Sequence, residues 1–308
     1  MKKVTVIGAG NVGATCAHLI LSKGLADVVF VDAVDGLARG KALDLMQAQP
    51  IEGFRTQITG TSYRESAGSD IVVITAGIAR RPGMSREELA EKNISIVTEV
   101  AGQAIRYAPE AVFIIVSNPL DLMCLVCKAV TRLPRERVIG QAGVLDGARM
   151  SYFISQLAPQ CSVHEIHALV LGSHGDTMVP VISQSSVGTT LLTDVFSEKE
   201  IEDIVTRTRR AGAEIVDHLK TGSAFYSPAA ATVKMAEAIL TDSNERLCCS
   251  VYLEGEYGLS GMFIGVPAVL GAGGVKQIIE LPLNQQESRA FKASFDSLTS
   301  YAQSLGLL

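Results

Sequence analysis

The sequence predicts an α/β fold in which a doubly wound parallel sheet is followed by a C-terminal α+β domain. Short runs rich in Val and Ile alternate with helical apolar spacing over the first half, as expected of a parallel sheet buried on both faces. The second half mixes long helices with strands joined by glycine-containing turns. Right-handed crossovers make the first half doubly wound. We place the division between residues 1–143 and 144–308.

Each element follows from a local pattern. In the first half we expect a helix over 11–24, between the first two strands. In the second half, helices are predicted over 147–158, 197–219, 224–242 and most of the last thirty residues. The helix at 197 begins with Ser197 and Glu200, the spacing of a capping box. The predicted strands are 3–10, 27–33, 69–77, 111–119, 137–143, 166–175, 251–258 and 262–271.

Composition excludes several classes of protein. Hydrophobic residues make up 47% of the 308, enough for a sizeable core, and the net charge of −5 gives no general attraction for nucleic acid. Polar residues interrupt the apolar stretch 111–130, and the first apolar run stops at Gly8, too early for a signal peptide. We therefore expect a cytoplasmic protein with no membrane or nucleic-acid partner.

Six cysteines raise the question of a metal or redox site. Cys124 and Cys127 form a C-x-x-C pair, but they lie in a stretch with the apolar repeat of a buried helix. No second pair stands at zinc-ligand spacing. We expect free core thiols and no bound metal.

The stretch GAGNVG, residues 8–13, predicts a Rossmann-type dinucleotide site. It follows a strand and opens a helix, and Asp32 ends the next strand. Gly8 permits the tight turn, Gly10 lets a pyrophosphate approach the backbone, and Gly13 lets the helix pack closely. Asp32 would accept hydrogen bonds from ribose hydroxyls and repel a 2′-phosphate, so NAD is expected rather than NADP. The alternative is a glycine-rich turn without a ligand, as we expect for GAGGVK at 271–276.

A second group of residues suggests acid–base chemistry. His174 lies between small residues after an apolar strand, and Asp146 and Arg149 are three residues apart at a helix start. An aspartate beside an imidazole fixes its tautomer, and an arginine nearby can hold a carboxylate through two hydrogen bonds. Asn118 follows the fourth strand at the sheet edge where ligands bind. The alternatives are an ordinary surface ion pair for Asp146 and a helix N-cap for Asn118.

Taken together, these motifs resemble the lactate/malate dehydrogenase superfamily along the whole chain, and most of all its bacterial lactate-dehydrogenase-like malate dehydrogenases. The resemblance rests on long stretches in the same order, among them ITAGIARRPGMSREEL, RVIGQAGVLDGAR and LGSHGDTMVP. It implies an NAD-dependent oxidoreductase that interconverts (S)-malate and oxaloacetate, with a role in the tricarboxylic acid cycle. It also implies an NAD-binding domain over 1–143 and a substrate-binding, catalytic domain over 144–308.

The resemblance assigns roles to individual residues. It implies that His174 is the general acid/base, which would titrate near neutrality, that Asp146 is its partner, and that Arg149 binds the carboxylate next to the reacting carbon. Arg86 resembles the loop arginine that polarises the C2 oxygen, and Asn118 the asparagine that contacts substrate and cofactor. The other cofactor contacts implied are Gly8, Gly10, Asn11, Val12, Gly13, Asp32, Asn93, Val116 and Ser117.

Arg80 occupies the position that sets substrate choice in the family. An arginine there offers a counter-charge to the second carboxylate of oxaloacetate, whereas related lactate dehydrogenases carry glutamine. Because burying an unpaired carboxylate is costly, Arg80 favours a dicarboxylate over pyruvate. The alternatives are a dehydrogenase for lactate or another 2-hydroxy acid, and a non-catalytic NAD-binding module. One departure from the pattern is Thr177, where related malate dehydrogenases often have an acid.

The sequence also favours self-association. A mean hydropathy of +0.28 suggests that some apolar surface is buried between subunits. The resemblance leaves both a dimer and a tetramer open. We therefore expect a homo-oligomer.

Overall fold

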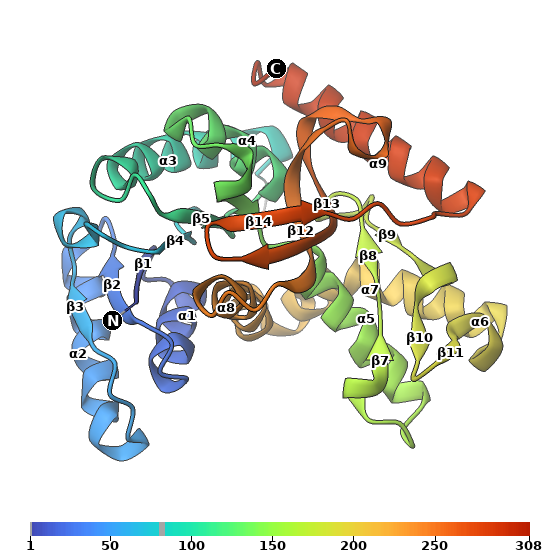
Figure 1. Cartoon of the computed structure of the whole chain (residues 1–308), viewed down its shortest axis with the longest axis horizontal. Coiled ribbons are helices and arrows are strands. Elements are labelled where there is room, and N and C mark those ends of the chain that lie inside the picture. Colours follow the sequence, from blue (N-terminus) through green and yellow to red (C-terminus); the bar gives the residue numbers. More distant parts are fainter. Residues whose placement is uncertain (1, 80–83) are drawn as a thin grey trace. The chain divides into compact units, whose positions relative to one another are not determined.

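A computed structural model describes residues 2–79 and 84–308 of the chain (Figure 1). The chain forms two compact units, each described separately below. The first unit comprises Met1–Gln141, Phe225–Glu245 and Val269–Gln277, and the second comprises Ala142–Ala224, Arg246–Ala268 and Ile278–Leu308. The first unit thus includes two segments from the part of the sequence that the division at 143/144 assigns to the second domain.

The first unit is built on a parallel sheet with the strand order β6-β5-β4-β1-β2-β3. Val6 of β1 pairs with Phe30 on one side and Val73 on the other, so β1 lies in the middle of the sheet. The predicted α/β, doubly wound fold is confirmed. Strand β3 was not predicted, because it is a short edge strand with an exposed middle residue. The strands are β1 (Lys3–Ile7), β2 (Asp27–Val31), β3 (Ile58–Gly60), β4 (Ile71–Ile74), β5 (Val112–Ile115) and β6 (Val138–Gly140).

Helices cover both faces of this sheet. In Figure 1, α3 and α4 lie side by side on one face, and α1 and α8 lie together on the other. Strands β4 and β5 are therefore buried along their whole length, which explains their unbroken apolar sequences. The helices are α1 (Asn11–Ser22), α2 (Asp35–Glu52), α3 (Arg86–Tyr107), α4 (Leu120–Thr131) and α8 (Tyr226–Leu240), with 3₁₀ turns at Tyr63–Ser66 and Arg135–Arg137.

The second unit packs long helices around small antiparallel sheets. Its core is formed by α5 and α7 together with the strands that follow α5, and includes Met150, Ile154, Val170 and Ile204. The predicted strand 166–175 is broken into β7 and β8, because the chain bends into separate ladders. The helices are α5 (Gly143–Leu157), α6 (Leu192–Val195), α7 (Glu198–Leu219) and α9 (Gln285–Ser304). The short strands are β7 (Ile166–His167), β8 (Val170–Leu171), β9 (Val179–Pro180), β10 (Ser186–Val187) and β11 (Thr190–Leu191).

Three further strands follow α8 in the sequence and precede α9: β12 (Glu245–Glu254), β13 (Ser260–Gly271) and β14 (Gly274–Ile278). Strand β13 lies between β12 and β14 in the sheet. The stretch GAGGVK forms the turn from β13 into β14, as the sequence predicted, with Gly273 and Gly274 at positive φ. Across residues 2–79 and 84–308, no helix has both the length and the apolar character needed to span a membrane.

Candidate functional site

The glycine-rich turn joins β1 to α1. Gly8 has φ of 108°, and a Cβ there would lie 2.7 Å from the Ala76 nitrogen. A Cβ on Gly13 would overlap the Gly8 carbonyl oxygen, so α1 packs against the turn only with glycine at this position. Gly10 differs from both, because its Cβ direction is open with nothing within 4 Å. The turn is therefore tight on its inner side and open at the start of the helix.

That open helix start is suited to an anion. Gly10 is the N-cap of α1 and makes no side-chain capping bond, and no acid lies in the first turn. The unpaired amides that begin at Asn11 and Val12, together with the helix dipole, attract phosphate. The residues present therefore fit the pyrophosphate of a dinucleotide.

Asp32 is held at the tip of β2 by backbone donors. Its Oδ2 accepts a hydrogen bond from the Ala9 N–H at 2.6 Å, and its Oδ1 accepts one from the Val34 N–H at 2.8 Å. Each carboxylate oxygen has capacity left for a ribose hydroxyl. Lys41, which the sequence analysis did not identify, donates to the Ala9 carbonyl at 2.8 Å. Ala9 is thus hydrogen-bonded through both its N–H and its carbonyl. No sequence spacing points to Lys41, because it lies on α2, 32 residues from Ala9.

The tips of β4 and β5 form the neighbouring part of the site. Val116 and Ser117 are buried, and the Ser117 hydroxyl donates to the Ala76 carbonyl at 2.5 Å. Asn118 is exposed, and the Asn118–Pro119 peptide bond is cis. Helix α4 begins after Pro119, and its N-cap makes no side-chain hydrogen bond, so Asn118 is not the helix cap. The Asn118 side chain lies at the sheet edge where ligands of this fold bind.

Asn93 lies beneath these tips rather than on the surface. It is 1% exposed, and its amide nitrogen donates to the Asn118 carbonyl at 2.6 Å and to the Ile78 carbonyl at 3.1 Å. Its amide oxygen accepts from the Ile78 N–H at 2.8 Å. A Cβ on Gly77 would lie 3.1 Å from that oxygen, so glycine leaves room for the amide. The side chain joins the chain after β4 to the chain after β5.

Of the two arginines predicted to bind substrate from this segment, Arg86 lies within the described residues. Arg86 is the first residue of α3 and is exposed, behind an N-cap at Ser85 whose hydroxyl accepts from the Glu88 N–H at 3.0 Å. This capping box fixes where α3 begins and therefore places Arg86 at the first position of the helix. Arg80 lies outside the described residues, so its predicted contact with a second carboxylate stays a prediction.

In the second unit, His174 and Asp146 form a direct pair. His174 Nδ1 lies 2.8 Å from Asp146 Oδ2, although the two residues are 28 positions apart. Asp146 is 2% exposed and lies in the first turn of α5, where the helix dipole favours a carboxylate. Arg149 Nη1 lies 3.4 Å from the other oxygen, Oδ1. The structure thus brings together the three polar residues that the sequence placed in this half.

Two glycines explain how α5 packs closely against the segment that leads to His174. A Cβ on Gly143 would lie 2.6 Å from the Val170 carbonyl oxygen, and one on Gly147 would lie 2.9 Å from the Ala168 carbonyl oxygen. Their i,i+4 spacing puts both on one face of the helix, beside β7 and β8. Asp146 lies between these two glycines. The close approach of α5 therefore brings its carboxylate to His174, two residues after Gly172.

Arg149 is a partly buried cation, with 14% of its side chain exposed. Burial lowers the pKa of Arg149 below its ordinary value, and the Asp146 carboxylate opposes that shift. Its Nε is buried without a hydrogen-bond partner. A guanidinium with unused donors beside an imidazole is suited to a carboxylate ligand.

The cysteines lie away from these groups. All six are free thiols, and all but Cys161 are buried, as the sequence predicted for core cysteines. Burial raises the pKa of Cys127 to about 12, so its thiol is unreactive at neutral pH. In the part of the chain that the structure describes, no cluster of three or more His, Cys, Asp or Glu side chains is arranged to hold a metal ion.

Comparison with known proteins identifies the family. The model for the lactate/malate dehydrogenase NAD-binding domain matches residues 2–140, and that for the α/β C-terminal domain matches 143–304. The chain therefore belongs to the lactate/malate dehydrogenase family of oxidoreductases.

Relatives carry both names of the family. A malate dehydrogenase from a Roseiflexus species is 51% identical, over 97% of this chain and 96% of its own. The structure of a malate dehydrogenase from Cryptosporidium parvum has a TM-score of 0.96 at 40% identity, covering 100% and 99% of the two chains. The lactate dehydrogenase of the same organism, solved with lactic acid and nicotinamide adenine dinucleotide, has a TM-score of 0.95 at 38% identity, covering 99% and 98%. The fold alone does not separate the two activities.

Proposed function

We propose that the chain catalyses the reversible NAD-dependent oxidation of (S)-malate to oxaloacetate. The observation that carries the proposal is the His174–Asp146 pair at 2.8 Å, with Arg149 beside it. An imidazole backed by a buried carboxylate is a proton acceptor, and a neighbouring arginine selects an anionic substrate. The choice of substrate is supported by relatives that are named malate dehydrogenase and are 48% and 51% identical to this chain.

The first unit holds the cofactor. When bound, NAD would supply hydride transfer between malate C2 and its nicotinamide ring. Gly8, Gly10 and Gly13, with the amides of Asn11 and Val12, would hold the pyrophosphate. Asp32 would accept hydrogen bonds from the adenine-ribose hydroxyls and would disfavour a 2′-phosphate by charge repulsion. Val116, Ser117 and Asn118 line the strand tips near the reactive end.

The second unit moves the proton. Because Asp146 pairs with Nδ1 of His174, Nε2 is left to accept the C2 hydroxyl proton of malate as the hydride departs. The proton transfer avoids the formation of a free alkoxide. In the reverse direction, the imidazolium delivers the same proton to the carbonyl oxygen of oxaloacetate. The Asp146 carboxylate stabilises that imidazolium and fixes its orientation.

Arginines bind the substrate's charges. Arg149 holds the carboxylate next to C2, and its unpaired Nε supports this role. Arg80 pairs with the second carboxylate, and Arg86 polarises the C2 oxygen. Asn118 orients the substrate by its amide.

The second candidate is a dehydrogenase of lactate or another 2-hydroxy acid. The observation in its favour is the TM-score of 0.95 with the lactate dehydrogenase from Cryptosporidium parvum. The test is kcat/KM with NADH for oxaloacetate and pyruvate, side by side, in the wild-type chain and in Arg80→Gln. We expect a preference for oxaloacetate that falls by about two orders of magnitude in the variant, since it loses a buried charge pair. Equal turnover of both substrates by the wild type would contradict malate as substrate.

We further propose a cytoplasmic homo-oligomer, a dimer or a tetramer, serving the tricarboxylic acid cycle. Exposed apolar residues on and just before α2 support self-association. They are Val34, Leu37, Leu43 and Ile51. Sedimentation equilibrium on the purified chain distinguishes the two states.

A further inference from the structure

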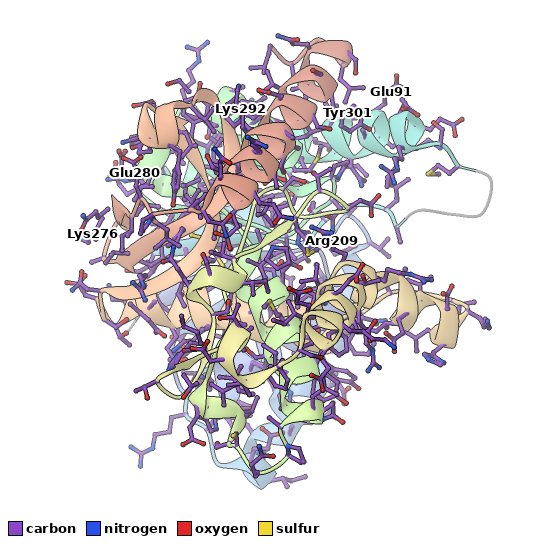
Figure 2. The ribbon with its side chains drawn as sticks, turned by 90° about the vertical axis from the view of Figure 1, so that its right-hand side faces the viewer. Glu91, Arg209, Lys276, Glu280, Lys292 and Tyr301 are labelled. Carbon is purple, nitrogen blue, oxygen red and sulfur yellow. The ribbon has the colours of Figure 1, made fainter. Side chains whose placement is uncertain are left out.

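His174 lies in a loop whose ends are fixed by other parts of the second unit. At the start of the loop, Gly172 exchanges two backbone hydrogen bonds with Gly265 of β13, at 2.9 and 3.0 Å. Gly172 has φ of 86°. At the far end, the carbonyl of Met178 accepts from the Arg209 guanidinium at 3.4 Å. Arg209 is labelled on α7 in Figure 2, together with Lys292 and Tyr301, which mark the course of α9.

Between these ends, three hydroxyls form a cluster that we call the hydroxyl triangle. It consists of Ser173, Thr177 and Ser294. The Ser173 and Thr177 hydroxyls lie 2.8 Å apart, and the Thr177 and Ser294 hydroxyls 3.2 Å apart. The Ser294 hydroxyl oxygen also accepts from the Ser173 N–H at 3.0 Å. Ser294 is 1% exposed on α9, so its hydroxyl is shielded from bulk solvent.

The triangle fixes the residues on both sides of His174 to one atom of a long helix. Ser173 directly precedes His174, and Thr177 follows three residues later. Gly175 lies between them and adds no steric restraint of its own. The bond between Ser173 and Thr177 closes the loop on itself, and Ser294 connects both of its ends to α9.

We propose that Ser294 is a positioning residue for His174. Its hydroxyl holds the loop so that Nδ1 meets Asp146 and Nε2 keeps one direction. The inference rests on the acid–base role proposed for His174. It also gives a structural role to Thr177, because a hydroxyl there completes the triangle.

The test compares Ser294→Ala with Thr299→Ala. Thr299 is a matched control, because it lies on the same helix and its hydroxyl donates to the Phe295 carbonyl of that helix, at 2.9 Å. For each variant we would measure kcat and KM for oxaloacetate, the Kd for NADH, the melting temperature, and the primary isotope effect on kcat with C4-deuterated NADH.

Ser294→Ala should lower kcat about tenfold, since a displacement well below 1 Å at a reacting group has effects of this order. The isotope effect on kcat should rise, because hydride and proton transfer become slower than product release. The Kd for NADH should stay within about twofold of wild type, since the first unit is untouched. Thr177→Val should show a smaller loss of kcat, Thr177→Ser none, and Thr299→Ala none.

A Ser294→Ala enzyme with wild-type kcat and isotope effect would overturn the proposal. So would a loss of kcat in equal proportion in Thr299→Ala, which would indicate general loosening of α9. Failure of the proposed function is a separate result, because the wild-type chain itself would then fail to reduce oxaloacetate.

Discussion

The candidate sites of the two units differ in the chemical groups that form them. The first unit uses backbone: a tight turn at Gly8 and Gly13, an open helix start at Gly10, and strand tips held by buried amides and hydroxyls. The second uses charged side chains brought together across the fold, with His174 and Asp146 28 residues apart. Backbone sites bind a shape and charge common to many ligands, whereas paired side chains perform one reaction. The comparison predicts that changes in each unit affect different measurements.

Among changes that leave His174 in place, the largest effect is expected in the second unit, from Asp146→Asn. The amide keeps the volume but removes the charge that stabilises the imidazolium, and its NH₂ group can face Nδ1 and favour the wrong tautomer. We expect kcat to fall by about 10³. The Kd for NADH, measured by fluorescence titration, should be unchanged. A variant that lost NADH binding in parallel would break the distinction between the units.

A matched pair in the first unit sharpens the comparison. In Gly13→Ala the new methyl group overlaps the Gly8 carbonyl oxygen, so the free energy of unfolding should fall by about 1–3 kcal/mol or more. In Gly10→Ala the methyl group enters open space at φ of −65°, so the melting temperature should be preserved. In the proposed cofactor site the same methyl group would occupy the place of the pyrophosphate, so we expect NADH affinity to fall. Equal melting temperatures for the two variants would contradict this account of the turn.

The smallest expected effect is a pH dependence in Asn93→Asp. A carboxylate there would face the carbonyls of Ile78 and Asn118, which now accept from the Asn93 amide. The charged form is disfavoured, so the folded-state pKa of the new carboxyl should lie above the unfolded value of about 3.9.

The sign of that dependence follows from linkage. The variant should be closest to wild type below about pH 4, and should lose up to about 1–3 kcal/mol as the pH rises through the folded-state pKa. Urea unfolding of both proteins across this range measures the difference. A penalty that is constant with pH would mean that the buried amide does not donate as described.

Sequence patterns predicted much of this molecule because they report local physics. GAGNVG and Asp32 predicted the turn, since a strand, a helix and a tight turn each depend on neighbours in sequence. The spacing of Asp146 and Arg149 predicted that they share a helix face. The meeting of His174 with Asp146 required the family resemblance, because a contact across 28 residues depends on how α5 packs, through Gly143 and Gly147.

Other features left no local signal. Lys41 reaches the Ala9 carbonyl from α2, and Ser294 reaches the His174 loop from α9, 121 residues from Ser173. A single lysine or serine on an amphipathic helix looks like any other surface position. The return of α8 to the first unit depends on packing between distant segments, which no short pattern records.

The most direct test of the central claim is a pair of measurements on His174→Asn: the Kd for NADH and the kcat for oxaloacetate reduction. We expect NADH affinity within about twofold of wild type and a kcat lower by about 10³ or more, because in the proposed mechanism the first unit binds the cofactor and His174 supplies the proton. Turnover near the wild-type rate would contradict His174 as the acid–base group. Loss of NADH binding together with turnover would contradict the separation of roles between the two units.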